Sequence, residues 1–410
     1  MRPQATRPAA PHAKRTGVAP PETHRSCATP FESVALLLQG GGALGAYQAG
    51  VYEALHEAGI EPTWIAGISI GAINSAIIAG NPREHRVARL RAFWEQVSAA
   101  RDGGWADQWT RLVTFDAARG WLNQLAAGQI VAGGVPGFFT PRLPPPYLTP
   151  PGSPGATSWY DAAALRSTLE RLVDFDLINA KAMRFSVGAV NVRTGNFAYF
   201  DNEIDTIGPE HVMASGALPP AFEAVEIEDE LYWDGGLVSN TPLDWVLSAH
   251  SALDTLIFQV DLWSARGDAP RDLSEVAVRM KEVQFSSRTR AATDTFRRLQ
   301  HFRATFNELL AKMPPELAAT PQARMLAEAS DPAVYNIIQL VYRSPTYEGQ
   351  SKDYEFSRRT MEEHWLAGRR DALATLAHPE VLIPPTAAHG VEVYDFVTPS
   401  ARVAPPSKKE

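Results

Sequence analysis

A serine between two glycines is the group in this chain with the surroundings of a nucleophile. The stretch GISIG places Ser69 at the centre of a G-x-S-x-G pattern that runs from Gly67 to Gly71. It follows the apolar run TWIAGI and precedes small and apolar residues. A sharp turn from strand to helix would project the hydroxyl at a helix N-terminus, where it can attack a carbonyl carbon. Serine also suits an ordinary helix cap, so this pattern alone leaves both interpretations open.

A glycine-rich stretch earlier in the chain is suited to binding negative charge. The sequence QGGGALG places Gly40, Gly42 and Gly45 in a G-x-G-x-x-G pattern between an apolar run and a helical pattern. Backbone amides in such a loop bind either a pyrophosphate or the oxyanion of a reaction intermediate. A dinucleotide site also needs an acidic residue at the end of the next strand. Glu61 has nearly the required spacing but precedes that strand, so the pattern favours an oxyanion hole.

A serine nucleophile needs a base, and a carboxylate is the best candidate. Asp234 begins the sequence DGG directly after the apolar run ELYW, and Gly235 and Gly236 allow another group to approach closely. A desolvated carboxylate that is hydrogen-bonded to a hydroxyl can accept its proton. None of the ten histidines is a clear candidate for the base. His211 comes nearest to suiting this role, whereas His364 falls in a C-terminal helical pattern. An ordinary Asp-Gly turn is the competing interpretation.

The three motifs, in this order, resemble those of the patatin-like phospholipases. The stretch ASGALPPAFEAVEIEDELYWDGGLVSNTPL, residues 214–243, adds to the likeness, which covers about residues 34–263. The following part, including KDYEFSRRT at residues 352–360, resembles a bacterial patatin subgroup with an extra C-terminal region. The resemblance implies a three-layer α/β fold, with a mostly parallel central sheet and helices on both faces.

The resemblance also implies a role for each motif. Ser69 would be the nucleophile and Asp234 its base, in a Ser-Asp dyad that needs no histidine. The backbone amides of Gly40, Gly41 and Gly42 would form the oxyanion hole. The remaining motif glycines are Gly45, Gly67, Gly71, Gly235 and Gly236. Gln39 departs from the Asp that plant members have before the glycines, at a position that is not catalytic.

The implied activity is hydrolysis of lipid acyl esters, of the phospholipase A or lysophospholipase type, without a metal or another cofactor. Two alternatives stay open. One is a non-catalytic lipid-binding regulatory protein of the same fold. The other is an esterase that acts on a polyester or a storage lipid with the same residues.

The motifs need a parallel sheet in which the strands before them end at the same edge, so that the motif residues meet there. Alternating apolar runs and helical patterns near the N-terminus are typical of such a sheet. We expect helices at 46–58 and from 72 to 79. We expect strands at 34–38, 63–68, 184–192, 196–201, 230–233, 253–263 and 335–342.

Composition divides the chain into segments. A Pro/Ala/Arg-rich tail, 1–33, is expected to be disordered, as is the tail 398–410. Between them we expect a catalytic domain at 34–265 and a mainly helical C-terminal region at 266–397. The Trp- and Pro-rich insertion 101–160 within the catalytic domain is a candidate lid or fixed cover.

The composition also limits the partners. The chain has 410 residues and a formal net charge of -8, which argues against a nucleic-acid partner. One cysteine, Cys27, excludes an intrachain disulfide and a Cys-rich zinc site. No apolar run reaches 18 residues, so we expect a cytoplasmic protein, with peripheral membrane contact left open.

Three stretches could contact a lipid surface. VPGFF at 135–139 and PPPYL at 144–148 are apolar, with a rigid cover over the core as the alternative. Residues 271–312 contain nine Lys and Arg against five Asp and Glu, although a solvated helix face is the commoner explanation of such a run.

Overall fold

The central strand of the sheet is the apolar run that precedes the glycine loop. The computed structural model describes residues 29–99, 116–153, 155–248, 253–286, 289–329, 333–345, 347–386 and 390–396. Strand β1, Ser33–Leu38, is buried at all six positions. It pairs in parallel with β2, Trp64–Gly67, and with β9, Thr255–Asp261. A parallel strand covered on both faces needs apolar side chains throughout, which explains the sequence SVALLL.

The described residues form a mostly parallel sheet of nine strands in the order β11-β10-β9-β1-β2-β5-β8-β7, with β6 paired to β5. The six strands from β11 to β5 are parallel, and β6, β7 and β8 pair antiparallel with their neighbours. The remaining strands are β5 Arg184–Asn191, β6 Phe197–Asp201, β7 Val225–Ile227, β8 Glu230–Asp234, β10 Tyr335–Val341 and β11 Val391–Tyr394. The expected strands are confirmed, whereas β7 and β11 were not anticipated.

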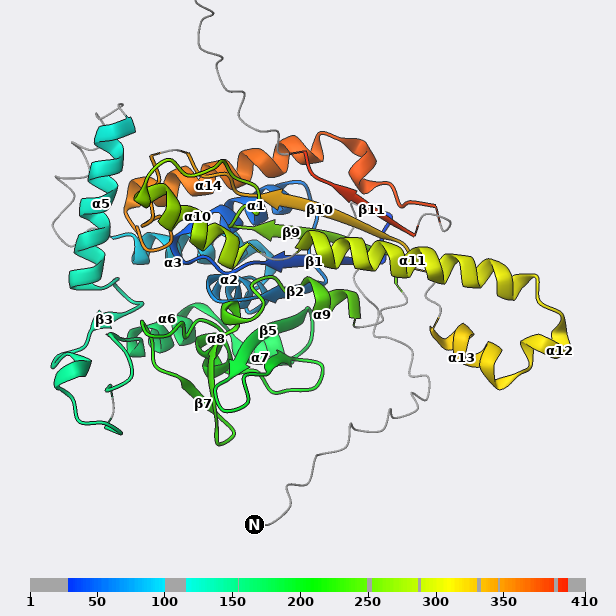
Figure 1. Ribbon diagram of the computed structural model, residues 1–410, viewed down its shortest axis with the longest axis horizontal. Coiled ribbons are helices and arrows are strands. Elements are labelled where there is room, and N and C mark those ends of the chain that lie inside the picture. Colours follow the sequence, from blue (N-terminus) through cyan, green and yellow to red (C-terminus); the bar gives the residue numbers. More distant parts are fainter. Residues whose placement is uncertain are drawn as a thin grey trace, which may run out of the picture.

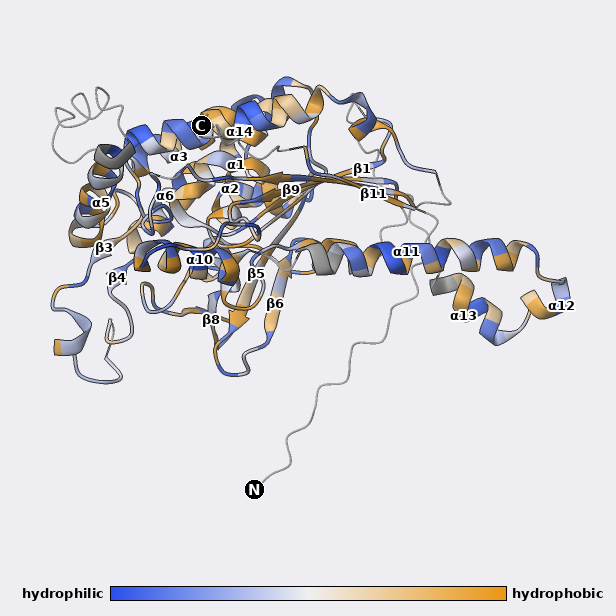
Figure 2. Cartoon of the chain, turned by 45° about the horizontal axis from the view of Figure 1, so that its top comes forward, coloured by the Kyte–Doolittle hydropathy of each residue, from blue (hydrophilic) through white to orange (hydrophobic). Residues whose placement is uncertain are grey.

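Helices cover both faces of the sheet, because successive side chains of β1 enter two different cores. Leu36 and Leu38 belong to the larger core. Its helices are α1 Ala46–Glu57, α2 Ile70–Ala79, α3 Arg86–Val97 and α14 Arg358–Leu376. Ala35 and Leu37 belong to the second core, with side chains from α9, Leu243–Ser248, and α11, Thr289–Ala311. The expected three-layer α/β fold is therefore confirmed (Figure 1), and hydrophobic residues follow the central strands (Figure 2).

The region after residue 266 adds to this same sheet. Strand β10, expected at 335–342, pairs in parallel with β9 and carries β11 on its other side. Helix α14 crosses α1 so closely that a Cβ on Gly368 would overlap the carbonyl oxygen of Tyr47, and a Cβ on Gly50 that of Trp365. The C-terminal region is thus joined to the elements that carry the nucleophile and the glycine loop.

Two helical segments of this region extend past the edges of the layers (Figure 1). Helix α10, Leu273–Phe285, runs near the end of the sheet that bears the motifs. Helix α11 projects beyond the sheet, with α12, Pro315–Ala318, and α13, Pro321–Ala329, at its far end (Figure 1). None of the helices described is both long and apolar enough to cross a bilayer.

The insertion has more regular structure than its proline content indicates. Helix α5, Asp116–Gly133, was not expected, and β3, Thr140–Pro141, pairs with β4, Tyr160–Asp161. Phe138 and Phe139 are buried and pack on Phe222, so this part of VPGFF is a cover over the core. Tyr147 of PPPYL is exposed instead. The stretch 100–115, residues 1–28 of the expected N-terminal tail and the whole expected C-terminal tail, 398–410, lie outside the described residues.

Candidate active site

Ser69 occupies a strained turn between β2 and α2. Its backbone angles are φ 55° and ψ -123°, a conformation that residues with a Cβ rarely adopt. The Ser69 amide donates to the hydroxyl of Ser215 at 3.0 Å, and that hydroxyl donates to the carbonyl of Gly188 at 2.7 Å. The Ser69 side chain makes no capping hydrogen bond to α2. The helix-cap interpretation is therefore wrong, and the geometry is that of a nucleophile elbow.

The glycines of the elbow are required by close packing. A Cβ on Gly67 would overlap the carbonyl oxygen of Gly71, and a Cβ on Gly71 would overlap that of Leu38 at the end of β1. Gly45 faces the side chain of Ile70 in the same way. The elbow and the glycine loop are therefore packed against each other without room for a methyl group.

The sheet register brings Asp234 to Ser69. Gly67 at the end of β2 lies beside Val187 of β5, and Asp234 at the end of β8 lies beside Ala189, two residues further along β5. The carboxylate of Asp234 accepts a hydrogen bond from the Gly236 amide at 2.7 Å. The Ser69 side chain lies within interaction range of the same carboxylate and favours its ionised form. The Asp-Gly turn therefore places a buried carboxylate beside the serine.

Burial gives this carboxylate the base strength of an imidazole. Asp234 is only 2% exposed. Burial raises its pKa from 3.8 to about 7, against the opposing effect of the hydrogen bonds from Ser69 and Gly236. A base with a pKa near the working pH is still ionised in part and binds a proton firmly, which is the balance that general-base catalysis needs.

The glycine loop lies on the other side of Ser69. The Gly40 carbonyl accepts hydrogen bonds from the Trp263 indole at 2.9 Å and from the Asn240 side chain at 3.0 Å. The two ends of a trans peptide point in opposite directions, so the amide of Gly41 faces away from these donors. The Gly40 amide already donates to the Asn240 carbonyl at 3.3 Å. Within the described part of the chain, the amides of Gly41 and Gly42 have no acceptor.

Gln39 anchors this loop from the preceding position. Its side chain is buried and accepts hydrogen bonds from the amides of Leu262 and Trp263, at 2.6 and 2.9 Å. It donates in turn to Thr241 at 3.0 Å. The glutamine therefore ties the glycine loop to the end of β9.

A cavity of about 310 Å³ begins at these groups. Ser69, Asp234 and the three glycines Gly40, Gly41 and Gly42 are part of its wall. Most of the wall is apolar, and among the described residues that line it there is no lysine, arginine or histidine. The apolar lining comes from Ile70, Ile73, Ile130, Val131, Phe138, Phe139, Leu218, Ala221, Phe222, Trp263, Phe285 and Phe356. Such a wall suits a hydrocarbon chain whose reactive end reaches Ser69.

The residues weighed as alternatives have other structural roles. His211 accepts a hydrogen bond from the Gly208 amide at 2.9 Å and caps α8, Pro209–Ser215. Glu61 lies before β2, where it forms ion pairs with Arg83 and Arg86. Neither position suits a base for Ser69 or a ligand for a ribose at the end of β2.

Several groups that hold the site were not predicted. Ser215 and Asn240 lie within the stretch 214–243, but nothing in their local pattern indicates a bond to the Ser69 amide or the Gly40 carbonyl. Trp263 and Asp353 come from more distant parts of the chain and also line the cavity. Their contacts depend on tertiary structure, so only homologous sequences could have indicated them.

Comparison with known proteins agrees with this geometry. Residues 36–247 match the family model described as patatin-like phospholipase. The chain belongs to the patatin-like phospholipase family. Residues 283–388 match a second model, described as patatin phospholipase, which covers much of the C-terminal region. Membership of the patatin-like phospholipase family implies lipid acyl hydrolase activity.

Among solved structures, the patatin-like chain is similar to the crystal structure of VipD from Legionella pneumophila. The two share 15% identity, with a TM-score of 0.36, over 85% of this chain and 67% of that one. No curated protein matches the chain.

The raised pKa of Asp234 predicts that esterase activity of this patatin-like protein rises with pH through about 7, because only the ionised carboxylate accepts the serine proton. The measurement is kcat/KM for a short-chain p-nitrophenyl ester as a function of pH. Asp261 is a matched control, since burial also raises its pKa to about 7 and it does not line the cavity. Asp261→Asn should leave the midpoint of the pH profile of kcat/KM unchanged. A shift of that midpoint in Asp261→Asn would contradict the assignment of the titrating group to Asp234.

The same carboxylate should destabilise the fold when it is ionised. Its folded pKa is raised above the unfolded value of 3.8, so its contribution to stability is lost as pH rises from about 4 to about 7. Asp234→Asn is expected to raise the free energy of unfolding at pH 8 by about 1 to 4 kcal/mol while it abolishes activity. Urea unfolding of the two proteins measures this difference, and a less stable Asn variant would count against the burial effect.

Proposed function

We propose that this protein hydrolyses lipid acyl esters of the phospholipase A or lysophospholipase type, with Ser69 as nucleophile and Asp234 as base. The observation that carries the proposal is a strained serine beside a buried carboxylate, both in the wall of one largely apolar cavity. A protein that only binds lipid needs neither a strained serine nor an acceptor for its proton.

In the first step, the Ser69 oxygen attacks the ester carbonyl carbon and its proton passes to Asp234. The negative charge that develops on the carbonyl oxygen is bound by the amides of Gly41 and Gly42. The Ile70 amide joins them, because α2 begins at this residue and the first amides of a helix have no intrahelical acceptor. Each such donor lowers the barrier by about 3 kcal/mol. The alcohol then leaves with the proton from Asp234.

In the second step, water attacks the acyl group bound to Ser69, and Asp234 accepts a proton from that water. The same amides bind the second oxyanion. Collapse of this intermediate releases the fatty acid and returns the proton to Ser69. A single carboxylate serves as base and then as acid in each half-reaction, which its pKa near 7 permits.

The lining of the cavity suits the acyl chain of a lipid but not its charged headgroup. Its wall has no cationic side chain among the described residues, so it suits the acyl chain. A charged headgroup keeps its hydration only if it stays at the mouth, since burying an unpaired charge is costly. We infer that the acyl chain enters and the headgroup remains outside.

Ser69→Ala tests the proposal. The variant should lose at least about a thousandfold of kcat/KM on a short-chain ester, and it should release no fatty acid from lysophosphatidylcholine, because the acyl-enzyme cannot form. Ser75→Ala is a matched control in the same helix, since the Ser75 hydroxyl is buried without a hydrogen-bond partner. That control should keep full activity, and unchanged turnover by purified Ser69→Ala would refute the proposal.

We further propose that the cavity mouth contacts a lipid surface through helix α10. Four apolar side chains spaced three, four and three residues apart share one face of this helix and are exposed. They are Leu273, Val276, Met280 and Val283, at 86%, 45%, 63% and 60% exposure. Figure 2 shows hydrophobic and hydrophilic residues alternating along α10. The helix ends at Phe285, which lines the cavity, so α10 itself lies beside the mouth.

Charge contributes less to this contact. The three cations at α10, Arg271, Arg279 and Lys281, are each paired with a carboxylate. Two other exposed apolar segments also border the cavity. Val131 of α5 lines it and is 51% exposed, and Leu237 and Val238, which follow Gly236, are exposed as well. A cytoplasmic location with peripheral attachment stays a prediction from the sequence.

Met280→Glu tests the lipid contact. The variant should bind phosphatidylcholine vesicles several-fold more weakly and hydrolyse them more slowly, because a charge on the apolar face opposes burial in the interface. Its activity on a water-soluble ester should not change. Leu317→Glu on α12, far from the cavity, is the matched control, since Leu317 is also exposed. Equal vesicle binding by Met280→Glu and the unmodified protein would rule out this surface.

A further inference from the structure

The C-terminal region reaches the glycine loop through its backbone. The carbonyl oxygen of Asp353 accepts a hydrogen bond from the Ala43 amide at 2.8 Å. Gly42 adopts φ 56°, and a Cβ there would overlap the same carbonyl oxygen. Asp353 is held in turn by Lys281, whose ammonium lies 2.8 and 2.9 Å from the two carboxylate oxygens. Position 42 therefore needs glycine, because any side chain there would collide with the carbonyl oxygen of Asp353.

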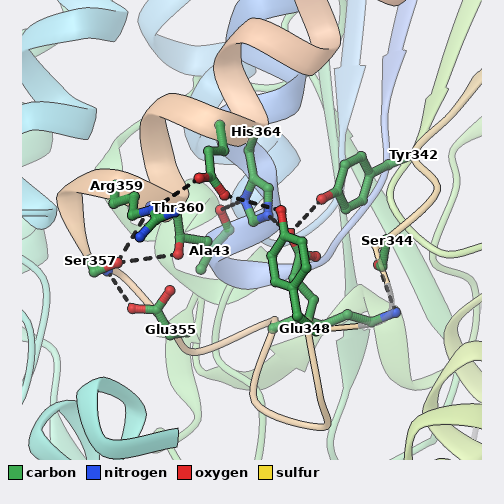
Figure 3. Close-up of polar contacts among 12 residues, drawn as sticks. Ala43, Tyr342, Ser344, Glu348, Glu355, Ser357, Arg359, Thr360 and His364 are labelled. Carbon is green, nitrogen blue, oxygen red and sulfur yellow. Dashed lines mark hydrogen bonds and ion pairs between the residues drawn. The ribbon is translucent and has the colours of Figure 1, made fainter. Parts of the chain in front are cut away.

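A buried histidine contacts the carbonyl of the same residue, Ala43. His364 of α14 lies with its Nδ1 3.4 Å from the carbonyl oxygen of Ala43 and its Nε2 3.0 Å from Glu348 (Figure 3). Tyr342, at the end of β10, donates its hydroxyl to the same Glu348 oxygen at 2.7 Å. The His364 and Glu348 side chains are buried. Ala43 is thus held at its amide and at its carbonyl by residues of the C-terminal region.

Both partners of His364 are acceptors, which determines its protonation. A carbonyl and a carboxylate each require a donor, so the ring contacts both fully only when both nitrogens carry a proton. Burial alone would lower the pKa of His364, but the charge of Glu348 and its hydrogen bond raise it above the usual value. The two acceptors and the charge of Glu348 therefore all favour the doubly protonated ring.

The surroundings of this pair come from four elements. Glu355, on the segment before α14, adds a second buried carboxyl group near the ring. Lys352 lies near Glu348 and is itself paired with Glu282 of α10 at 2.9 Å. Tyr342 packs edge-on against the imidazole at 5.0 Å and, on its other side, contacts Tyr47 of α1 at 5.2 Å. The packing leaves the ring in one orientation, toward Ala43.

We propose that His364, oriented by Glu348 and Tyr342, is a positioning residue that holds the glycine loop as an oxyanion hole. This inference rests on the proposed esterase function. Gly41 and Gly42, whose amides would bind the oxyanion, directly precede Ala43, so a shift of Ala43 moves both donors relative to Ser69. Stabilisation of an oxyanion depends on donors that are already in place, and small displacements weaken it. The C-terminal region thereby becomes part of the catalytic apparatus.

The test compares an ester with its thionoester, in which sulfur replaces the carbonyl oxygen and accepts hydrogen bonds poorly. His364→Gln should lower kcat on the ester at least about tenfold and leave KM within about twofold, because the lost stabilisation belongs to the transition state. The kcat of the same variant on the thionoester should fall much less, because the amides of the glycine loop stabilise the transition state of the thionoester only weakly even in the unmodified protein. The ratio of ester to thionoester turnover should therefore fall.

His378→Gln is the matched control. His378 also pairs with a glutamate, Glu380 at 3.2 Å, but the pair is at the surface and does not contact the glycine loop. Where His364→Gln does not fold, as judged by its thermal unfolding, Tyr342→Phe removes a single hydrogen bond to Glu348 and should lower kcat a few-fold with the same selectivity for the ester.

Two results would overturn the inference. One is an unchanged kcat in folded His364→Gln and Tyr342→Phe. The other is an equal loss on both substrates, which indicates a general structural effect. Failure of the proposed function is a separate outcome, in which the unmodified protein does not hydrolyse the ester or Ser69→Ala hydrolyses it equally well.

Discussion

The placement of the Ser69 side chain beside the buried carboxylate of Asp234 is the constraint on which the rest of the structure depends. It requires a serine with a positive φ angle at the end of one strand and a buried carboxylate at the end of another, both beside β5. Each requirement opposes stability, since the backbone is strained and the carboxylate is desolvated. The surrounding glycine contacts, the hydrogen bonds of Ser215 and the large core hold this arrangement in place.

In the proposed mechanism, burial also explains why a dyad would suffice. An exposed aspartate is too weak a base to accept a proton from serine at neutral pH, and many hydrolases place a histidine between the two. Here burial raises the pKa of the carboxyl group to about 7, so under the proposed mechanism the aspartate would take the role of the imidazole. The opposing hydrogen bond from Gly236 keeps the shift small enough for the group to remain partly ionised.

Much of the fold, and the strand ends that carry Ser69 and Asp234, could be predicted from the sequence, because they depend on local patterns. Apolar runs ending in glycine motifs identified β1, β2 and β8, and with them Ser69 and Asp234. Short edge strands such as β7 and β11 lack a distinctive pattern, and α5 was obscured by the neighbouring prolines. The commitment of the Gly40 amide to Asn240, 200 residues away in the chain, arises only from tertiary packing. So does the contact between Ala43 and His364.

The most direct measurement of the central claim is covalent labelling by a fluorophosphonate, which reacts quickly only with an activated serine. The labelled protein is digested and its peptides are mapped by mass spectrometry. The account predicts a single phosphonylated residue, Ser69, with labelling that speeds up as Asp234 ionises above about pH 7. An unlabelled Ser69, or a label on another serine in a protein that hydrolyses esters, would contradict it.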